Sequence, residues 1–208
     1  MTCTKKRILT TSLSLFNQSG LSQVTLRTIA KEMGISQGNL NYHFKKRHEI
    51  IEGLYLELVD NIDQSMTYLD YTTIDLKVMF DMSKIIMTHF YEYRFFMIDF
   101  VQIIRSNPFI KNHYLELTKQ RDRQFLLLFN ALVAENILRK PLIRDEYLNF
   151  YKRTQIMGDF WLSSAISTHT KLNPSLIDKY YKLINESIYP YLTTKGMERY
   201  HELIGKNK

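Results

Sequence analysis

The chain has 208 residues and a formal net charge of +7 at pH 7, with 28 Lys and Arg against 21 Asp and Glu. This length allows one or two domains with a sizeable core, and the charge favours a polyanionic partner. The single cysteine, Cys3, excludes an internal disulfide, so a reducing cytoplasm is the expected compartment. No run of 18 apolar residues is present and residues 5–7 are basic, so we expect neither a membrane span nor a signal peptide.

Helical periodicity runs through almost the whole chain, and seven glycines and four prolines leave few interruptions. The sequence therefore predicts an all-α fold. In chain order, we expect helices over about residues 4–19, 26–33, 37–44, 46–69, 74–92, 93–106, 108–138, 145–168 and 174–191, with a short tail helix to about 204. Pro108 suits a first helical turn, and Pro141 lies in an expected loop over residues 139–144.

Residues 25–44 predict two short amphipathic helices joined by a tight turn. Thr25 suits the N-cap of the first helix, Gly34 suits the left-handed residue that ends it, and Ser36 can cap the second helix. The apolar positions share one face of each helix: Leu26, Ile29, Ala30 and Met33 in the first, and Leu40 and Phe44 in the second. This pattern is typical of a helix-turn-helix unit that reads DNA.

The outward face of the second helix, with the residues that follow it, is polar and basic. Its members are Gln37, Gly38, Asn39, Asn41, Tyr42, His43, Lys45, Lys46 and Arg47. Amide side chains can pair with base edges, and a glycine lets the backbone come close to DNA. The tyrosine, histidine and basic side chains can reach phosphates. A solvated helical hairpin is the alternative interpretation of the same polar face.

The net positive charge is concentrated in the same part of the chain. Residues 1–48 contain eight Lys and Arg and one acid, Glu32, so they carry a net charge of +7 and the other 160 residues are neutral overall. That distribution is typical of a segment that binds a polyanion. A membrane surface is the other polyanion to consider, but residues 37–44 lack the large outward apolar groups of a membrane anchor.

Residues 5–50 resemble the DNA-binding domain of TetR-family transcriptional regulators, over about a quarter of the chain. The matching positions are Ile8, Leu15, Phe16, Gly20, Thr25, Ile29, Ala30, Gly34, Ser36, Gly38, Leu40 and Tyr42 to Lys45. Asn41 departs from the pattern because many members carry an aromatic residue there, and Arg47 replaces a phosphate-binding lysine. The resemblance implies a helix-turn-helix DNA-binding domain over residues 1–48 and a helical ligand-binding and dimerisation domain over residues 49–208.

The resemblance also implies roles for individual residues and a mode of action. Thr25 and Arg27 would contact the DNA backbone or a groove edge. Bases would be faced by Gln37, Gly38, Asn39 and Asn41, and phosphates would be held by Tyr42, His43, Lys45 and Arg47. Family members commonly bind a palindromic operator as homodimers, repress transcription, and dissociate when a small ligand binds the C-terminal domain. The expected partners are therefore double-stranded DNA, a second copy of the chain, and a small, mostly apolar ligand.

Phenylalanine and methionine recur at helical spacing between residues 79 and 132. A packed core is the ordinary interpretation, and an apolar ligand cavity is the alternative, since these side chains adapt to varied guests. The resemblance favours the cavity. Its expected lining comprises the apolar residues Phe80, Ile86, Phe90, Phe96, Phe100, Phe125 and Phe129, with His89, Asp99 and Gln102 available to orient a polar end of the guest.

The run from Ile156 to Ile166 is nearly apolar all round, with small residues interspersed, so it must be buried on several sides. Burial within one chain and burial in a dimer explain this equally well, and the resemblance favours a four-helix contact made by two copies of the last long helices. The expected interface residues are Tyr151, Gly158, Trp161, Leu162, Ala165, Tyr181, Ile184 and Ile188.

Signatures of catalysis are missing from the sequence. It contains no phosphate-binding glycine loop, no Gly-x-Ser-x-Gly and no histidines at metal-ligand spacing. We therefore expect no enzyme, cofactor or metal site. The resulting hypothesis is a cytoplasmic, dimeric repressor released by a ligand. The alternatives are a regulator with a filled C-terminal domain controlled by a protein partner, and a non-DNA interaction module on the same fold.

Overall fold

A computed structural model describes residues 3–70 and 72–205. Over these residues the chain is helical and forms no strand, and its one isolated β-bridge pairs Leu138 with Leu192. The predicted all-α class is confirmed. No helix among the described residues is long and apolar enough to cross a membrane.

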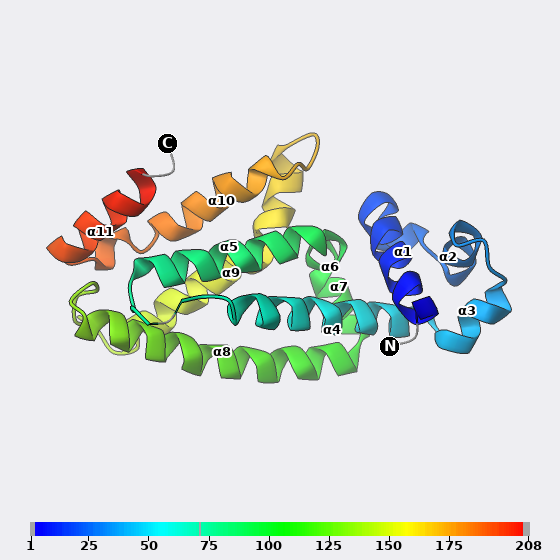
Figure 1. The fold of residues 1–208 in the computed structure, drawn as a ribbon, viewed down its shortest axis with the longest axis horizontal. Coiled ribbons are helices and arrows are strands. Elements are labelled where there is room, and N and C mark those ends of the chain that lie inside the picture. The colour runs from blue at the N-terminus through cyan, green and yellow to red at the C-terminus, as the bar shows by residue number, and fades with distance from the viewer. Residues whose placement is uncertain (1–2, 71, 206–208) are drawn as a thin grey trace.

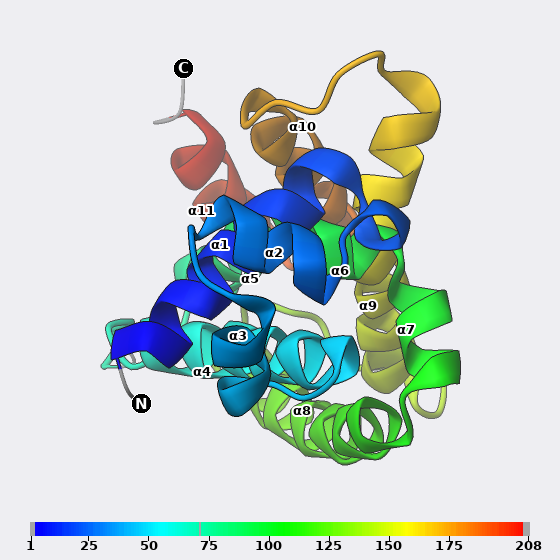
Figure 2. The ribbon, with the colours of Figure 1, turned by 90° about the vertical axis from the view of Figure 1, so that its right-hand side faces the viewer.

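The N-terminal helices form a small unit at one end of the elongated molecule (Figure 1). They are α1 (Cys3–Ser19), the 3-10 turn η1 (Leu21–Gln23), α2 (Leu26–Glu32) and α3 (Gln37–His43). Figure 2, seen from that end, shows α1, α2 and α3 in front of the body. Next in the chain is α4 (Arg47–Met66), a helix of 20 residues that runs from this unit into the body. The boundary expected at residue 48 therefore falls within the first turn of a continuous helix.

The body consists of longer helices packed around α4. They are α5 (Leu76–Glu92), α6 (Arg94–Ile98), α7 (Phe100–Ser106), α8 (Pro108–Ala134), α9 (Glu146–Thr168), α10 (Ser175–Glu186), the 3-10 turn η2 (Tyr189–Tyr191) and α11 (Thr194–Gly205). Helix α4 packs against α5 and α8, while α9 packs against α6, α8 and α10. Figure 1 shows α4, α5 and α8 running side by side along the body.

Four expected helices have different bounds in the structure, and one of them is α10, which ends at Glu186 although a helix to about residue 191 was expected. The helix expected over 93–106 is two helices, because the chain turns at Asp99, with φ −95° and ψ 16°. Aspartate competes for backbone hydrogen bonds inside a helix. Helix α4 ends three residues early, before a turn in which Asp70 accepts a hydrogen bond from the Thr72 amide at 2.9 Å. Helix α8 ends at Ala134 because Asn136 adopts a left-handed conformation with φ 56°.

The N-terminal unit and the body share one hydrophobic core. The main cluster of buried side chains runs without interruption from Ile8 on α1 through Ile50 on α4 and Phe95 on α6 to Trp161 on α9. A second cluster fills the far end of the body, where α8, α9 and the C-terminal segment meet. The first cluster therefore connects the packing of the body directly to the N-terminal helices.

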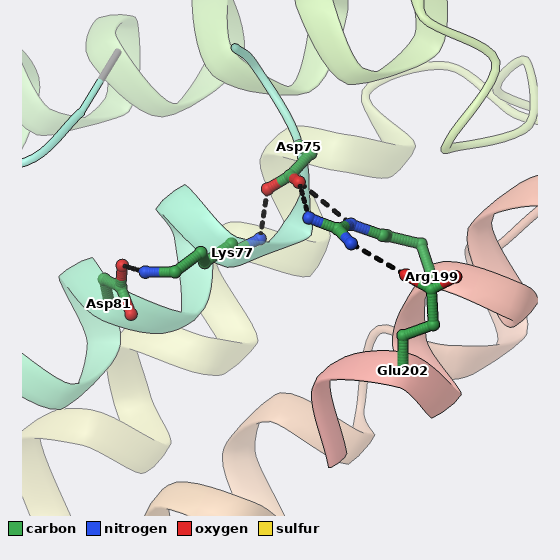
Figure 3. A network of polar contacts seen from close by, with 5 residues as sticks. All are labelled: Asp75, Lys77, Asp81, Arg199 and Glu202. Carbon is green, nitrogen blue, oxygen red and sulfur yellow. Dashed lines mark hydrogen bonds and ion pairs between the residues drawn. The ribbon is translucent and has the colours of Figure 1, made fainter. Parts of the chain in front are cut away.

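The C-terminal helix is anchored by a polar network (Figure 3). Asp75 caps α5 by accepting from the Lys77 amide at 2.6 Å, and it also accepts two hydrogen bonds from Arg199, at 2.9 and 2.6 Å. Arg199 in turn donates to Glu202 at 2.7 Å. This network ties α11 to the first turn of α5 at the end of the body far from α1–α3.

Candidate DNA interface and ligand cavity

The turn between α2 and α3 has the geometry that its sequence predicts. Thr25 and Thr28 form a reciprocal capping box: the Thr28 amide donates to the Thr25 hydroxyl at 3.2 Å, and the Thr25 amide donates to the Thr28 hydroxyl at 2.9 Å. Gly34 has φ 65°, a conformation that is cheap only for glycine, and the Ile35 amide then returns to the Ala30 carbonyl at 3.0 Å. These bonds fix the angle between the two short helices.

Helix α3 presents a polar face to solvent. The Ser36 hydroxyl accepts from the Asn39 amide at 3.1 Å and so starts the helix, while Leu40 and Phe44 are buried beneath it. Gln37, Gly38 and Asn39 are exposed on its first turn, and the Tyr42 side chain is 85% exposed. The Tyr42 ring and the amide side chains beside it are therefore available for contact with a binding partner and do not contribute to the core.

Basic side chains surround this face. Three basic side chains are exposed: Arg27 on α2, and Lys45 and Lys46 after α3. The neighbouring Thr25 is exposed as well. The face therefore combines hydrogen-bonding groups that can reach base edges with cations that can reach phosphates.

Two of the expected contact residues are partly buried. The Oδ1 atom of Asn41 is buried and accepts no hydrogen bond from a described group, which leaves its amide nitrogen for any outward contact. His43 is half-buried, and its ring meets the Tyr42 ring edge-on at 5.2 Å.

Arg47 turns away from the exposed face. Its guanidinium donates to the Leu21 carbonyl at 2.8 Å and to the Val24 carbonyl at 3.0 Å. These two bonds fasten η1 and the start of α2 to α4, so Arg47 is engaged within the protein. The expected phosphate contact of Arg47 is therefore corrected to a structural role.

A cavity of about 200 Å³ lies inside the body between α4, α5, α6, α8, α9 and α10. Its walls are mostly apolar, with Leu58 on α4, Met79 and Ile86 on α5, and Phe96 and Met97 on α6 among them. A concave, mostly apolar space with a few convergent polar groups is the usual form of a small-molecule site.

The principal polar group on the cavity wall is the carboxyl of Asp159 on α9. The Tyr114 hydroxyl donates to its Oδ2 atom at 2.7 Å, and the Gln155 amide donates to the Tyr114 oxygen at 3.2 Å. Burial raises the pKa of Asp159 to about 6, and the Tyr114 hydrogen bond lowers that pKa by a smaller amount. Burial also raises the pKa of Tyr114 well above its usual value. The cavity thus has one ionisable acid whose charge is poorly solvated.

Comparison with known proteins gives one consistent result. Residues 8–54 match the family model for bacterial regulatory proteins of the tetR family, and residues 57–200 match the model described as TetR, bacterial transcriptional repressor. The chain belongs to the TetR family of transcriptional regulators. The resemblance seen in the sequence is confirmed, and with it the family's helix-turn-helix DNA-binding domain.

Individual TetR relatives cover most of the chain. A TetR-family transcriptional regulator from Marinobacter aquaeolei VT8 has the same fold with a TM-score of 0.87 and 25% identity, covering 99% of this chain and 98% of that chain. YttP of Bacillus subtilis, described as a probable HTH-type transcriptional regulator, is 25% identical over 79% of this chain and 95% of its own length. YerO of the same organism, an uncharacterized HTH-type transcriptional regulator, is 27% identical over 62% of this chain, and the match spans only 46% of YerO.

The cavity of this TetR protein contains six of the ten residues expected to line it: Ile86, Phe90, Phe96, Phe100, Phe125 and Phe129. The other four lie elsewhere. Phe80 packs edge-on against Tyr181 and Tyr200 in the second cluster, and Gln102 is exposed. His89 bonds to Ser65 at 2.9 Å and Glu92 at 2.8 Å, outside the cavity.

Asp99, the fourth, lies at the corner between α6 and α7. Burial raises the pKa of its carboxyl, and a hydrogen bond with the backbone of Leu21 opposes that rise. It therefore faces the N-terminal unit and not the cavity. The acid on the cavity wall is instead Asp159, which was not predicted because it lies in the nearly apolar run on α9.

Most of the residues expected at a dimer interface are buried or line the cavity within one chain, so few of them are open to a second copy. Trp161, Leu162, Ala165 and Ile188 are 0–2% exposed. Tyr151, Gly158 and Ile184 line the cavity, and Tyr181 packs against Phe80. The faces of α9 and α10 that remain open carry different apolar residues: Ile156, Phe160, Ile166 and Leu183.

Proposed function

We propose that this TetR-family protein is a sequence-specific repressor that binds a palindromic operator as a homodimer and releases it when a small, mostly apolar ligand enters the cavity. The observation that carries the DNA-binding part is the exposed α3 face, within a segment that holds all of the net positive charge. The cavity of about 200 Å³ supports control by a ligand, and disfavours the alternative of a filled body regulated only by a protein partner.

The proposed DNA contacts are those expected from the sequence, with Arg47 removed and Lys46 in its place. Gln37, Gly38, Asn39 and the outward nitrogen of Asn41 would face bases in the major groove. Phosphates would be held by Thr25, Arg27, Tyr42, His43, Lys45 and Lys46. A protein bound to chromosomal DNA would act in the bacterial cytoplasm.

The proposed homodimer uses the open faces of α9 and α10. Ile156 is 61% exposed and Leu183 is 56% exposed, so apolar surface is available on both helices. A two-fold axis between them would place the two copies of α3 on successive major grooves, roughly 34–36 Å apart or a multiple of that.

Fluorescence anisotropy tests the DNA-binding part. The wild-type protein is titrated into labelled duplexes from upstream of its own gene and into a scrambled duplex, across a salt series, alongside Asn39→Ala and the surface control Asn130→Ala. Specific binding by the wild type and the control, weakened about 10-fold or more in Asn39→Ala, is expected. No binding to any duplex at low salt would overturn the proposal.

A further inference from the structure

At the polar end of the cavity, the hydrogen-bonding capacity of the Asp159 carboxyl is only partly used. The Tyr114 hydroxyl donates to Oδ2 of Asp159, and the same hydroxyl oxygen accepts a hydrogen bond from the Gln155 amide. Within the described chain, no donor reaches the Oδ1 atom of Asp159. The acid therefore keeps one free oxygen on the wall of an apolar space.

The charge of Asp159 is also unbalanced. Arg121 is the one cationic side chain among the described residues of the cavity wall, and it pairs with Asp63 of α4 instead. An ionised carboxylate in such a site is costly unless a cation joins it. The positive charge that would balance an ionised Asp159 therefore has to come from outside the chain.

Aromatic rings surround the place where a cation would lie. The Phe100 and Tyr114 rings are 5.1 Å apart and nearly edge-to-face, and Phe96 lies 6.0 Å from Phe100. The faces of such rings attract cations. Beyond them the cavity continues among Met87, Ile86 and other mostly apolar side chains, with neutral polar groups such as Ser83 and Asn185 but no second acid among the described wall residues.

We propose that the ligand of this cavity is a small organic cation with an apolar body, whose cationic group lies beside Asp159 and whose body packs among the aromatic and methionine side chains of α5 and α6. This inference rests on the ligand-responsive function proposed above. A neutral guest would leave the carboxylate unpaired, and an anionic guest would be repelled by it.

The test compares two probes of nearly equal shape: benzyltrimethylammonium, whose charge does not depend on pH, and neopentylbenzene, in which carbon replaces the nitrogen. Isothermal titration calorimetry is performed on the wild type, on Asp159→Asn, and on Asp60→Asn, which removes an exposed acid outside the cavity wall. The wild type and Asp60→Asn should bind the cation at least 10-fold more tightly than the neutral probe. In Asp159→Asn the two affinities should become nearly equal.

A pH series on the wild type gives a second measurement, whose main result needs no variant. The cation affinity should fall as pH decreases from 8 to 5, while the neutral probe should show little change. The other titratable groups around the cavity are Tyr55, Tyr114, Tyr151 and Arg121, and His113 bonds to Tyr55 at 2.8 Å. The fall should persist in His113→Gln and disappear in Asp159→Asn.

The outcomes separate this inference from the function on which it rests. Equal affinities for the two probes in the wild type, an unchanged preference in Asp159→Asn, or no cation binding at millimolar concentration would each overturn the cationic ligand. Operator binding, measured on the same wild-type preparation by anisotropy, is independent of all three. Its loss would overturn the regulator proposal instead.

Discussion

Phe16 on α1 and Phe95 on α6 stack with their ring centroids 4.9 Å apart. The contact joins the DNA-binding domain directly to the helix that carries Phe96 and Met97, two residues of the cavity wall. Beside it, the Asn17 side chain donates to the Glu92 carbonyl at 2.7 Å and accepts from the Phe95 amide at 3.0 Å. A guest that moves α6 would therefore also move α1, without using α4 as the only link.

Replacing Asn17 by Ala should weaken communication between cavity and DNA. The substitution removes both hydrogen bonds to the corner between α5 and α6, and leaves every described residue of the cavity wall and of the α3 face in place. We expect operator affinity without ligand to stay within a few-fold of the wild type. The loss of affinity caused by benzyltrimethylammonium should shrink, from a coupling of about 1–3 kcal/mol toward zero.

The control for Asn17→Ala is Gln18→Ala, which affects only an exposed hydrogen bond to Ser14 on the same helix. Anisotropy titrations of operator DNA with and without the cation measure the coupling for both variants. An undiminished cation effect in Asn17→Ala would show that α1 and α6 do not transmit it.

Arg47→Ala and Lys45→Ala should have opposite consequences, although each removes one positive charge. Arg47→Ala loses two hydrogen bonds to buried carbonyl groups, so the free energy of unfolding should fall by about 2 kcal/mol. Lys45→Ala should leave stability nearly unchanged and reduce the slope of log Kd against log salt by about 0.9, the value for one phosphate contact.

Urea denaturation and salt-dependent anisotropy measure the two quantities. The salt slope of Arg47→Ala should equal that of the wild type because its guanidinium is engaged with Leu21 and Val24. A slope reduced by a full phosphate contact in Arg47→Ala would restore the role expected for this residue from the sequence.

Ile156→Glu should separate the proposed dimer. The side chain is 61% exposed on α9, so the fold of one chain should tolerate the change, whereas a charge buried between two copies would be costly. We expect a monomer at micromolar concentration by analytical ultracentrifugation, with weaker operator binding because one half-site is lost.

Leu127→Glu on α8 is the matched control, since Leu127 is 70% exposed and lies outside the proposed interface. It should leave the protein dimeric. If both variants remained dimers, the two copies would meet through another surface.

Asp159→Asn should stabilise the empty protein in a pH-dependent way. Burial raises the pKa of Asp159 from 3.8 to about 6 in the folded chain, so the folded state binds the proton more tightly than the unfolded state. The associated stability is present in full below pH 4 and is lost as pH rises through 6. At pH 8 the ionised acid should cost up to about 3 kcal/mol, and the asparagine variant should avoid most of that cost.

Thermal unfolding at pH 5 and pH 8 measures this difference. The Tm advantage of Asp159→Asn should be large at pH 8 and small at pH 5, where the wild-type carboxyl is mostly protonated. An advantage that did not grow with pH would mean that the carboxylate is well solvated.

Sequence patterns predicted the helix-turn-helix closely because its determinants are local. A cap at Thr25, a left-handed Gly34 and a cap at Ser36 act within a few residues of where they stand, and the structure contains all three. The break between helices α6 and α7 at Asp99 was not predicted because no glycine or proline is present there. The Asp99 carboxyl at this break forms a hydrogen bond with the backbone of Leu21, 78 residues away, and sequence spacing cannot reveal such a contact.

The cavity was predicted less well than the DNA-binding face for a related reason. An apolar stripe shows that a side chain is inside but not whether it meets another helix or an open space. Trp161 and Gly158 belong to the same apolar run, yet one is in the core and the other lines the cavity. The role of Arg47 was likewise hidden, because its partners are carbonyl groups that no side-chain pattern records.

Helix α4 is uninterrupted over its 20 residues, from Arg47 at its first turn to the cavity wall and beyond. At 1.5 Å per residue it is about 30 Å long, so a tilt of roughly 5° about one end displaces the other by roughly 2–3 Å. Helix α4 can therefore act as a lever. A tilt too small to rearrange the packing around a guest would displace the far end of the helix by about the length of a hydrogen bond. Groove recognition tolerates no such error, so in the proposed mechanism a stiff α4 would let a small cavity control a distant DNA contact.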